Sequence, residues 1–173
     1  MALFVLSVVG SDRTGLTKAL AAAVLSAKGN WLESHLSRLG GLYVGSVLVE
    51  LGADDVEGLR AAVAAVDAHG LEVRIAPALA GPGPVGETLE FTLVGQDRPG
   101  IVNQVTTALS GQGANIEAFR TWITTEAHSG APLFNMEARL RLPPDLKVGA
   151  VQTALEAISA EIMVDISLTA AGA

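Results

Sequence analysis

The stretch Gly95-Gln96-Asp97-Arg98-Pro99-Gly100-Ile101 is the starting point for the fold, because the chain contains a second copy of it. That copy, Gly10-Ser11-Asp12-Arg13-Thr14-Gly15-Leu16, lies 85 positions earlier. Further on, Ser26-Ala27-Lys28-Gly29 matches Ser110-Gly111-Gln112-Gly113 at a spacing of 84, which predicts one extra residue in the helix of the first copy. An internal repeat of this length indicates two copies of one structural unit.

The stretch Ala80-Gly81-Pro82-Gly83-Pro84-Val85-Gly86 separates the two copies. Proline and glycine resist both helix and central strand, so this composition predicts a linker. We therefore expect one domain over residues 1–79, a linker over 80–86 and a second domain over 87–173. The linker also fits the Gly-x-Gly-x-x-Gly nucleotide pattern, but no helix is expected to begin there to receive a pyrophosphate.

In the second half, the apolar residues Leu89, Phe91 and Leu93 alternate with polar ones, which predicts a strand with one buried face. Asp97 suits a helix N-cap and Pro99 the first helical turn, and Gly111 then ends that helix. The elements predicted after it are strands Asn115–Thr125 and Leu133–Leu142, helix Leu146–Ser159 and strand Ile162–Leu168.

The first half shows the same order of elements. It predicts strand Leu3–Val9, helix Thr14–Lys28, strands Trp31–Leu39 and Tyr43–Leu51, helix Val56–Ala68 and strand Leu71–Ala76. The fold class expected is α+β: two ferredoxin-like βαββαβ domains, each an antiparallel four-stranded sheet with both helices on one face. The other sheet face and the edge strands then need a partner, so sheets are expected to pair within the chain or between chains.

Composition excludes several classes of protein. The 173 residues are 50% apolar, which argues against disorder, and the net charge of −7 opposes binding to a phosphate backbone. The absence of cysteine rules out disulfides and thiolate ligands, and His35, His69 and His128 are too scattered for a metal site, so no metal or cofactor is expected. The apolar run Ala2–Val9 is interpreted as a buried strand and not as a membrane or export segment, so the expected location is the cytoplasm.

The repeated turn lies between a strand and a helix, where free amide groups and the helix dipole favour an anion. Gly15 and Gly100 let a small carboxylate approach closely, and Asp12 or Asp97 accepts a hydrogen bond from an ammonium group. Asn115 adds an amide. The alternative is structural: each Asp caps its helix and each Gly only permits the turn.

Asp97-Arg98-Pro99-Gly100-Ile101, followed after one helix by Gly113-Ala114-Asn115-Ile116-Glu117, resembles the signature of the ACT domain. Two such units and little else resemble the tandem ACT family of glycine cleavage system transcriptional repressors. The resemblance implies a non-catalytic regulator whose units pair side by side, bind a small amino acid such as glycine or serine at their junction, and act on a partner. The partner would be a transcription factor or a metabolic enzyme, and a homodimer is expected.

The residues carried over from the resemblance fall into two sets. In the second copy they are Asp97, Arg98, Gly100, Ile101, Asn115 and Ile116; in the first they are Asp12, Arg13, Gly15 and Leu16. The first copy departs from the pattern, because Thr14 replaces the proline and the glycine alignment places Trp31 opposite Asn115, with Asn30 out of step. The second copy is therefore expected to be the better site, and Trp31 to pack in the core instead of closing a pocket.

Three other functions remain open from the residues. RNA-recognition modules share this topology, but they display aromatic side chains on a basic surface, whereas this chain has 4% aromatic residues. Acylphosphatases also share it and bind phosphate through an arginine, a role that Arg13 or Arg98 could imitate. The third alternative is a regulatory subunit of an amino-acid metabolic enzyme.

Overall fold

The computed structural model describes residues 1–67, 70–79, 81, 85–126, 129–162 and 164–170. It divides into two compact units, Met1–Pro82 (unit 1) and Gly83–Ala173 (unit 2). Residues 80 and 82–84 of the predicted linker, as well as His69 and His128, lie outside the described residues. In the part of the chain that is described, no helix has the length and apolar character needed to cross a bilayer.

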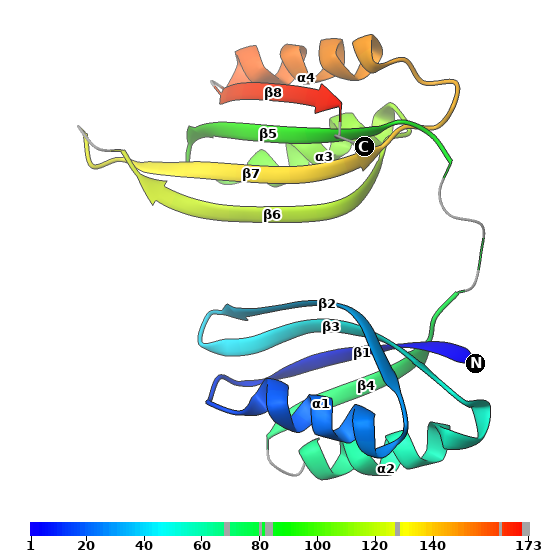
Figure 1. The fold of residues 1–173 in the computed structure, drawn as a ribbon. Helices are drawn as coiled ribbons and strands as arrows, with labels where there is room; N and C mark the ends of the chain where they lie inside the picture. The colour runs from blue at the N-terminus through cyan, green and yellow to red at the C-terminus, as the bar shows by residue number, and fades with distance from the viewer. Residues whose placement is uncertain (68–69, 80, 82–84, 127–128, 163, 171–173) are drawn as a thin grey trace. The chain divides into compact units, whose positions relative to one another are not determined.

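Unit 1 is a βαββαβ unit, as predicted (Figure 1). Its four strands form one antiparallel sheet in the order β2-β3-β1-β4, with both helices on one face. The elements are β1 (Ala2–Ser11), α1 (Leu16–Ser26), β2 (Asn30–Leu39), β3 (Leu42–Leu51), a 3₁₀ turn (Ala53–Asp55), α2 (Val56–Asp67) and β4 (Leu71–Pro77).

Unit 2 repeats this arrangement with the strand order β6-β7-β5-β8, which confirms the α+β fold class. Its elements are β5 (Thr88–Gln96), α3 (Ile101–Gly111), β6 (Asn115–Thr125), β7 (Pro132–Arg141), α4 (Val148–Ile162) and β8 (Val164–Ala170). Helix α4 begins and ends later than predicted. Pro143 and Leu146 close a separate turn before it, and residues 160–162 prolong the helix as far as Ile162, the first residue predicted as strand.

Both helices that follow the repeated turn also begin later than predicted. Gly15 and Gly100 lie at their N-caps in the left-handed conformation, each with φ of 95°. The chain therefore enters α1 at Leu16 and α3 at Ile101, and Pro99 precedes the helix instead of lying in its first turn.

The predicted extra residue in the first copy is wrong. The amide of Gly29 donates to the carbonyl of Val24 at 2.9 Å, and Ala114 donates to Leu109 at 3.1 Å in the same way, so the spacing stays 85 through the helix. Lys28 therefore takes the left-handed position, with φ of 54°, that Gly113 takes in unit 2. Glycine is the usual residue at this helix end, which explains why aligning the glycines misled the comparison.

The corrected register changes which residues correspond. Asn30 begins β2 opposite Glu50, as Asn115 begins β6 opposite Arg141, so Asn30 is the counterpart of Asn115 and is not out of step. Trp31 corresponds instead to Ile116. Both side chains are half-buried and pack against the cores of their units, which confirms the packing interpretation of Trp31.

Each unit has its own hydrophobic core between its sheet and its helices. Alternate residues on β1 and β5 point inward, as the period of two predicts. The largest fully buried side chains are Leu6, Leu20, Leu51, Leu59 and Leu71 in unit 1, and Phe91, Leu89, Leu93, Ile101, Leu109, Met136 and Leu140 in unit 2.

Candidate functional site

The first glycine of each repeated turn is structural. A Cβ added at Gly10 would lie 2.4 Å from the carbonyl oxygen of Gly70, and one added at Gly95 would lie 2.3 Å from Cγ1 of Val164. These contacts come from Gly70, directly before the edge strand β4, and from Val164, the first residue of the edge strand β8. The starts of these strands approach the ends of β1 and β5 closely. The glycine is needed so that the last strand of each unit can pair in full.

The two aspartates do not cap the helices, so the structural interpretation of Asp12 and Asp97 is wrong. The N-caps are glycines without a side-chain hydrogen bond, which leaves the first-turn amides of α1 and α3 without a side-chain acceptor. Asp12 instead forms an ion pair with Arg38 of β2, with Oδ2 and Nε 3.0 Å apart. Asp97 is exposed, and its carboxylate contacts no hydrogen-bonding or charged side chain among the described residues.

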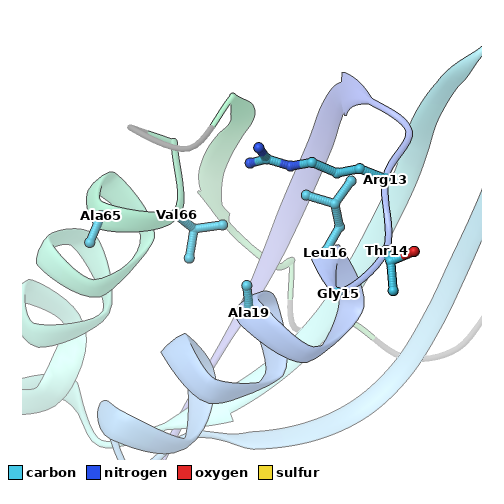
Figure 2. A pocket seen from close by; sticks show the side chains of 7 residues that line it. All are labelled: Arg13, Thr14, Gly15, Leu16, Ala19, Ala65 and Val66. Atoms are coloured by element: carbon cyan, nitrogen blue, oxygen red, sulfur yellow. The ribbon is translucent and has the colours of Figure 1, made fainter.

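In unit 1 the turn opens on a pocket of about 440 Å³ between the start of α1 and the last turn of α2 (Figure 2). Its walls are mostly apolar, and Arg13 is the one charged side chain among the described lining residues. The guanidinium of Arg13 makes no ion pair with any residue that the structure describes. The lining consists of Arg13, Thr14, Gly15, Leu16, Ala19, Ala65 and Val66.

The corresponding arginine of unit 2 is held differently. Arg98 Nη2 donates to Oε1 of Gln104 at 3.0 Å. Gln104 donates its backbone amide to Gly100, as Ala19 does to Gly15, so Ala19 and Gln104 occupy the same helical position. The small side chain of Ala19 offers Arg13 no hydrogen-bond partner, whereas the long amide of Gln104 occupies Arg98.

The structure does not bring all the predicted residues of one unit together. The turn Asp97–Gly100 follows the last residue of β5, whereas Asn115 pairs with Arg141, which pairs with Thr88, the first residue of β5. With about 3.3 Å per residue, Asn115 lies roughly 25 Å from the turn along the sheet. The side chain of Ile101 is buried in the core and Ile116 packs against it, so these two residues position the backbone.

Sequence reasoning missed the pocket residues Ala19, Ala65 and Val66. The α2 residues lie far from the turn in sequence and show no motif of their own. The one available signal is the contrast between Ala19 and Gln104, which stand at the same place in the two repeats.

Comparison with known proteins agrees with this description. Residues 2–76 match the ACT domain family. The crystal structure of an unknown protein from Galdieria sulphuraria is 32% identical, with 99% of each chain covered and a TM-score of 0.87. That of a candidate glycine cleavage system transcriptional repressor is 15% identical, with 97% of this chain and 96% of that chain covered and a TM-score of 0.68, which shows a shared fold. No curated protein sequence matches the chain.

The family match covers unit 1, unit 2 repeats its topology and strand order, and the Galdieria sulphuraria relative extends over both units. Unit 1 is therefore assigned to the ACT domain family, and unit 2 is a second unit with the same topology and strand order.

Proposed function

We propose that this protein is a non-catalytic regulator that binds a small amino acid, glycine or serine in the first instance, at its strand-to-helix turns. The observation that carries this proposal is the uncapped start of α1 and α3, where a repeated turn presents amides with no side-chain acceptor. Such amides and the helix dipole favour a carboxylate.

Each unit supports a different part of such a ligand. In unit 1, the guanidinium of Arg13, which makes no ion pair with a described residue, and the apolar pocket suit a carboxylate and a small side chain. In unit 2, the carboxylate of Asp97, which has no partner among the described residues, suits an ammonium group, whereas Asp12 is already engaged by Arg38. The expectation that unit 2 is the better ligand site therefore stays a prediction, and variants of both units are needed to test it.

A complete site requires two units. The edge strand β6 begins with Asn115 at one end of the sheet and ends near the turn at the other, because Asp97 donates its amide to the carbonyl of Pro132 at the β6–β7 hairpin. If the edge strands of two units pair antiparallel, the start of one lies beside the end of the other. Asn115 of one unit would then reach the turn of another, and Asn30 would do the same from β2.

The regulatory effect follows because binding of the ligand is thermodynamically linked to the arrangement of the units that it contacts. A ligand that contacts two units stabilises one arrangement of them only as far as it binds that arrangement more tightly. We propose that the arrangement is transmitted to a protein partner, either a transcription factor of the glycine cleavage system or an enzyme of amino-acid metabolism. Co-purification with and without the ligand would identify which partner responds.

The direct test is calorimetric titration of the full chain with the twenty amino acids. We expect one small amino acid to bind, and Asp97→Ala and Asn115→Ala to weaken it at least tenfold if unit 2 binds. Asn103→Ala, an exposed asparagine on α3, is the matched control and should bind as the wild type does.

The site in unit 1 is tested by giving it the residue that unit 2 carries at the same helical position. Ala19→Gln should fill the pocket and occupy Arg13, as Gln104 occupies Arg98, and should weaken binding at unit 1 at least tenfold; Arg13→Ala should do the same. Unchanged affinity in all four variants would contradict the site. Hydrolysis of an acyl phosphate that Arg13→Ala abolishes would contradict the non-catalytic role.

A further inference from the structure

The pocket of unit 1 joins an apolar floor to a positively charged side chain. Leu16 and Val66 line it and are only 4% and 8% exposed, so the floor belongs to the core of the unit. Ala19 and Ala65 add small side chains from α1 and α2. In Figure 2 the side chain of Arg13 extends from the turn toward the end of α2, and Leu16 and Val66 lie between the two helices.

The pocket is larger than the smallest amino acids need. A water molecule takes about 30 Å³ in the liquid, so a pocket of about 440 Å³ has room for roughly 15 non-hydrogen atoms. Glycine or serine would fill only part of this space and would leave the floor in contact with water. A ligand with an apolar body that covers Leu16 and Val66 gains by removing this surface from water.

Two features at the turn favour a carboxylate as the polar end of such a ligand. The first-turn amides of α1 have no side-chain acceptor, and the space beside Gly15 is open, because a Cβ built there would meet no described atom within 4 Å. Arg13 adds a guanidinium, which can hold a carboxylate through two parallel hydrogen bonds. The helix start and the arginine therefore attract the same charge.

The described residues offer no partner for an ammonium group. Asp12, the acidic residue of this turn, is not among the described lining residues, and its carboxylate is engaged by Arg38 at 3.0 Å. The lining residues that the structure describes include no acidic side chain. An ammonium group close to Arg13 and to the positive end of α1 would be repelled, so the pocket recognises the carboxylate alone.

Unit 2 has a polar side chain at the equivalent helical position. Gln104 stands where unit 1 has Ala19, and its Oε1 accepts a hydrogen bond from Nη2 of Arg98 at 3.0 Å. An apolar ligand body at this position would displace the amide and break the hydrogen bond, which leaves polar groups without a partner. This difference restricts the inference to unit 1.

We propose that the pocket of unit 1 binds a monocarboxylate with an apolar aliphatic or aromatic body, about ten non-hydrogen atoms in all. The carboxylate lies on Arg13 and the amides of α1, and the body covers Leu16 and Val66. This inference rests on the proposed function, because it uses the same turn as a carboxylate site, and it narrows the ligand class of unit 1. Unit 2, with Asp97, is left as the site for a ligand of the size of glycine.

The first test is calorimetric titration of the full chain with straight-chain carboxylates from acetate to octanoate. Each methylene that enters the pocket should tighten binding about fourfold, so octanoate should bind at least a hundredfold more tightly than acetate. Octylamine has the same chain and the opposite charge, and it should bind at least a hundredfold more weakly than octanoate. Addition of an ammonium group in 2-aminooctanoate should give no gain in affinity.

The second test removes the charge or the space. Arg13→Gln should weaken octanoate binding at least tenfold, and Ala19→Leu, which fills the pocket with an apolar side chain, should do the same. Arg60→Gln on α2 and Ala21→Leu on α1 are the matched controls, because both residues are exposed and neither is among the described lining residues. Both controls should bind octanoate as the wild type does, and circular dichroism checks that each variant folds.

The third test locates the bound carboxylate by the amide resonances of the two helices. In a nitrogen–proton correlation spectrum, the amides of Thr17 and Lys18 in the first turn of α1 should shift on addition of octanoate. Those of Val102 and Asn103, which stand at the same positions of α3, should not.

Several results would overturn the proposal. Equal affinity for acetate and octanoate would mean that the apolar floor takes no part. Octanoate affinity that survives Arg13→Gln or Ala19→Leu would mean that octanoate binds elsewhere, and equal shifts in α1 and α3 would mean that the repeated turn alone is responsible.

The outcomes for the two proposals can be told apart. Glycine binding without octanoate binding would overturn this inference and leave the proposed function standing. Octanoate binding with the expected dependence on Arg13 and Ala19, in a chain that binds no amino acid, would support this inference and contradict the proposed function.

Discussion

The inward residues of β1 and β5 are alike, and the residues between them are not. Phe4, Leu6 and Val8 correspond to Leu89, Phe91 and Leu93, which are buried in the core of unit 2. Outward, unit 1 has Val5 where unit 2 has Glu90. The repeated fold therefore depends on one face of each strand, and the other face is free to diverge toward a different role in each unit.

The largest expected effect is the loss of stability when a core side chain is removed, which tests whether the two cores are independent. Phe91→Ala removes a fully buried side chain from unit 2 and should destabilise that unit by about 3–5 kcal/mol. Leu6→Ala should do the same to unit 1 by about 2–5 kcal/mol. Urea unfolding followed by hydrogen exchange of each unit measures both. If either variant lowers the protection of both units equally, the cores are not independent.

A second comparison concerns the buried polar residue of unit 2. Asn135 occupies the position of Val44, and its Nδ2 donates to Thr124 Oγ1 at 2.9 Å and to the carbonyl of Leu133 at 3.1 Å. Asn135→Val should cost about 0.5–1.5 kcal/mol, because these hydrogen bonds are lost while the volume is nearly kept. Chemical denaturation measures the change, and a more stable variant would show that the amide serves something other than stability.

Replacement of Lys28, the left-handed residue at the end of α1, should give a smaller change, which is a gain in stability. Lys28→Gly should relieve about 1–2 kcal/mol of backbone strain and lose about 0.5–1 kcal/mol to the greater freedom of glycine in the unfolded chain. The exposed pair between Lys28 and Asp55, 3.3 Å apart, contributes little. The net gain should be under about 1 kcal/mol in thermal unfolding. Gly113→Lys should have the opposite sign.

The smallest effect should come from the exposed pair on unit 2. Glu90→Gln should lower the melting temperature only slightly at low salt, and the difference should vanish near 1 M salt, where screening acts over about 3 Å. Because the hydrogen bond and the charge of Glu90 raise the pKa of Arg139, its guanidinium keeps its charge through neutral pH, and its contribution is lost on the alkaline side only in strongly alkaline solution. The melting temperature of the wild type should therefore show no dependence on this arginine between pH 6 and 9.

The sequence predicts the fold well because two features of it can be recognised without the structure: the alternation of apolar residues and the internal repeat. Alternation along Leu89, Phe91 and Leu93 identifies the strand, and the repeat identifies the second unit. Helix starts were misplaced, since nothing in the sequence distinguishes a left-handed glycine cap from a glycine within the first turn. The end of α1 was misaligned because a lysine takes the place where glycine is expected.

The candidate site was predictable only in part. The turn residues Arg13 and Gly15 were found because they belong to a motif. The pocket depends on the packing of α2 against α1 and on the short side chain of Ala19, neither of which a motif records. The separation of Asn115 from its turn follows from strand direction, and it becomes visible only when the pairing of β5, β6 and β7 is known.

The two hydrophobic clusters share no residue, and this has a consequence for how the chain can be cut and joined. A protease that cleaves between Pro77 and Gly86 divides neither cluster, so each fragment keeps the apolar contacts of its own core. We expect either half to fold when it is fused to another protein, because its interior stays intact.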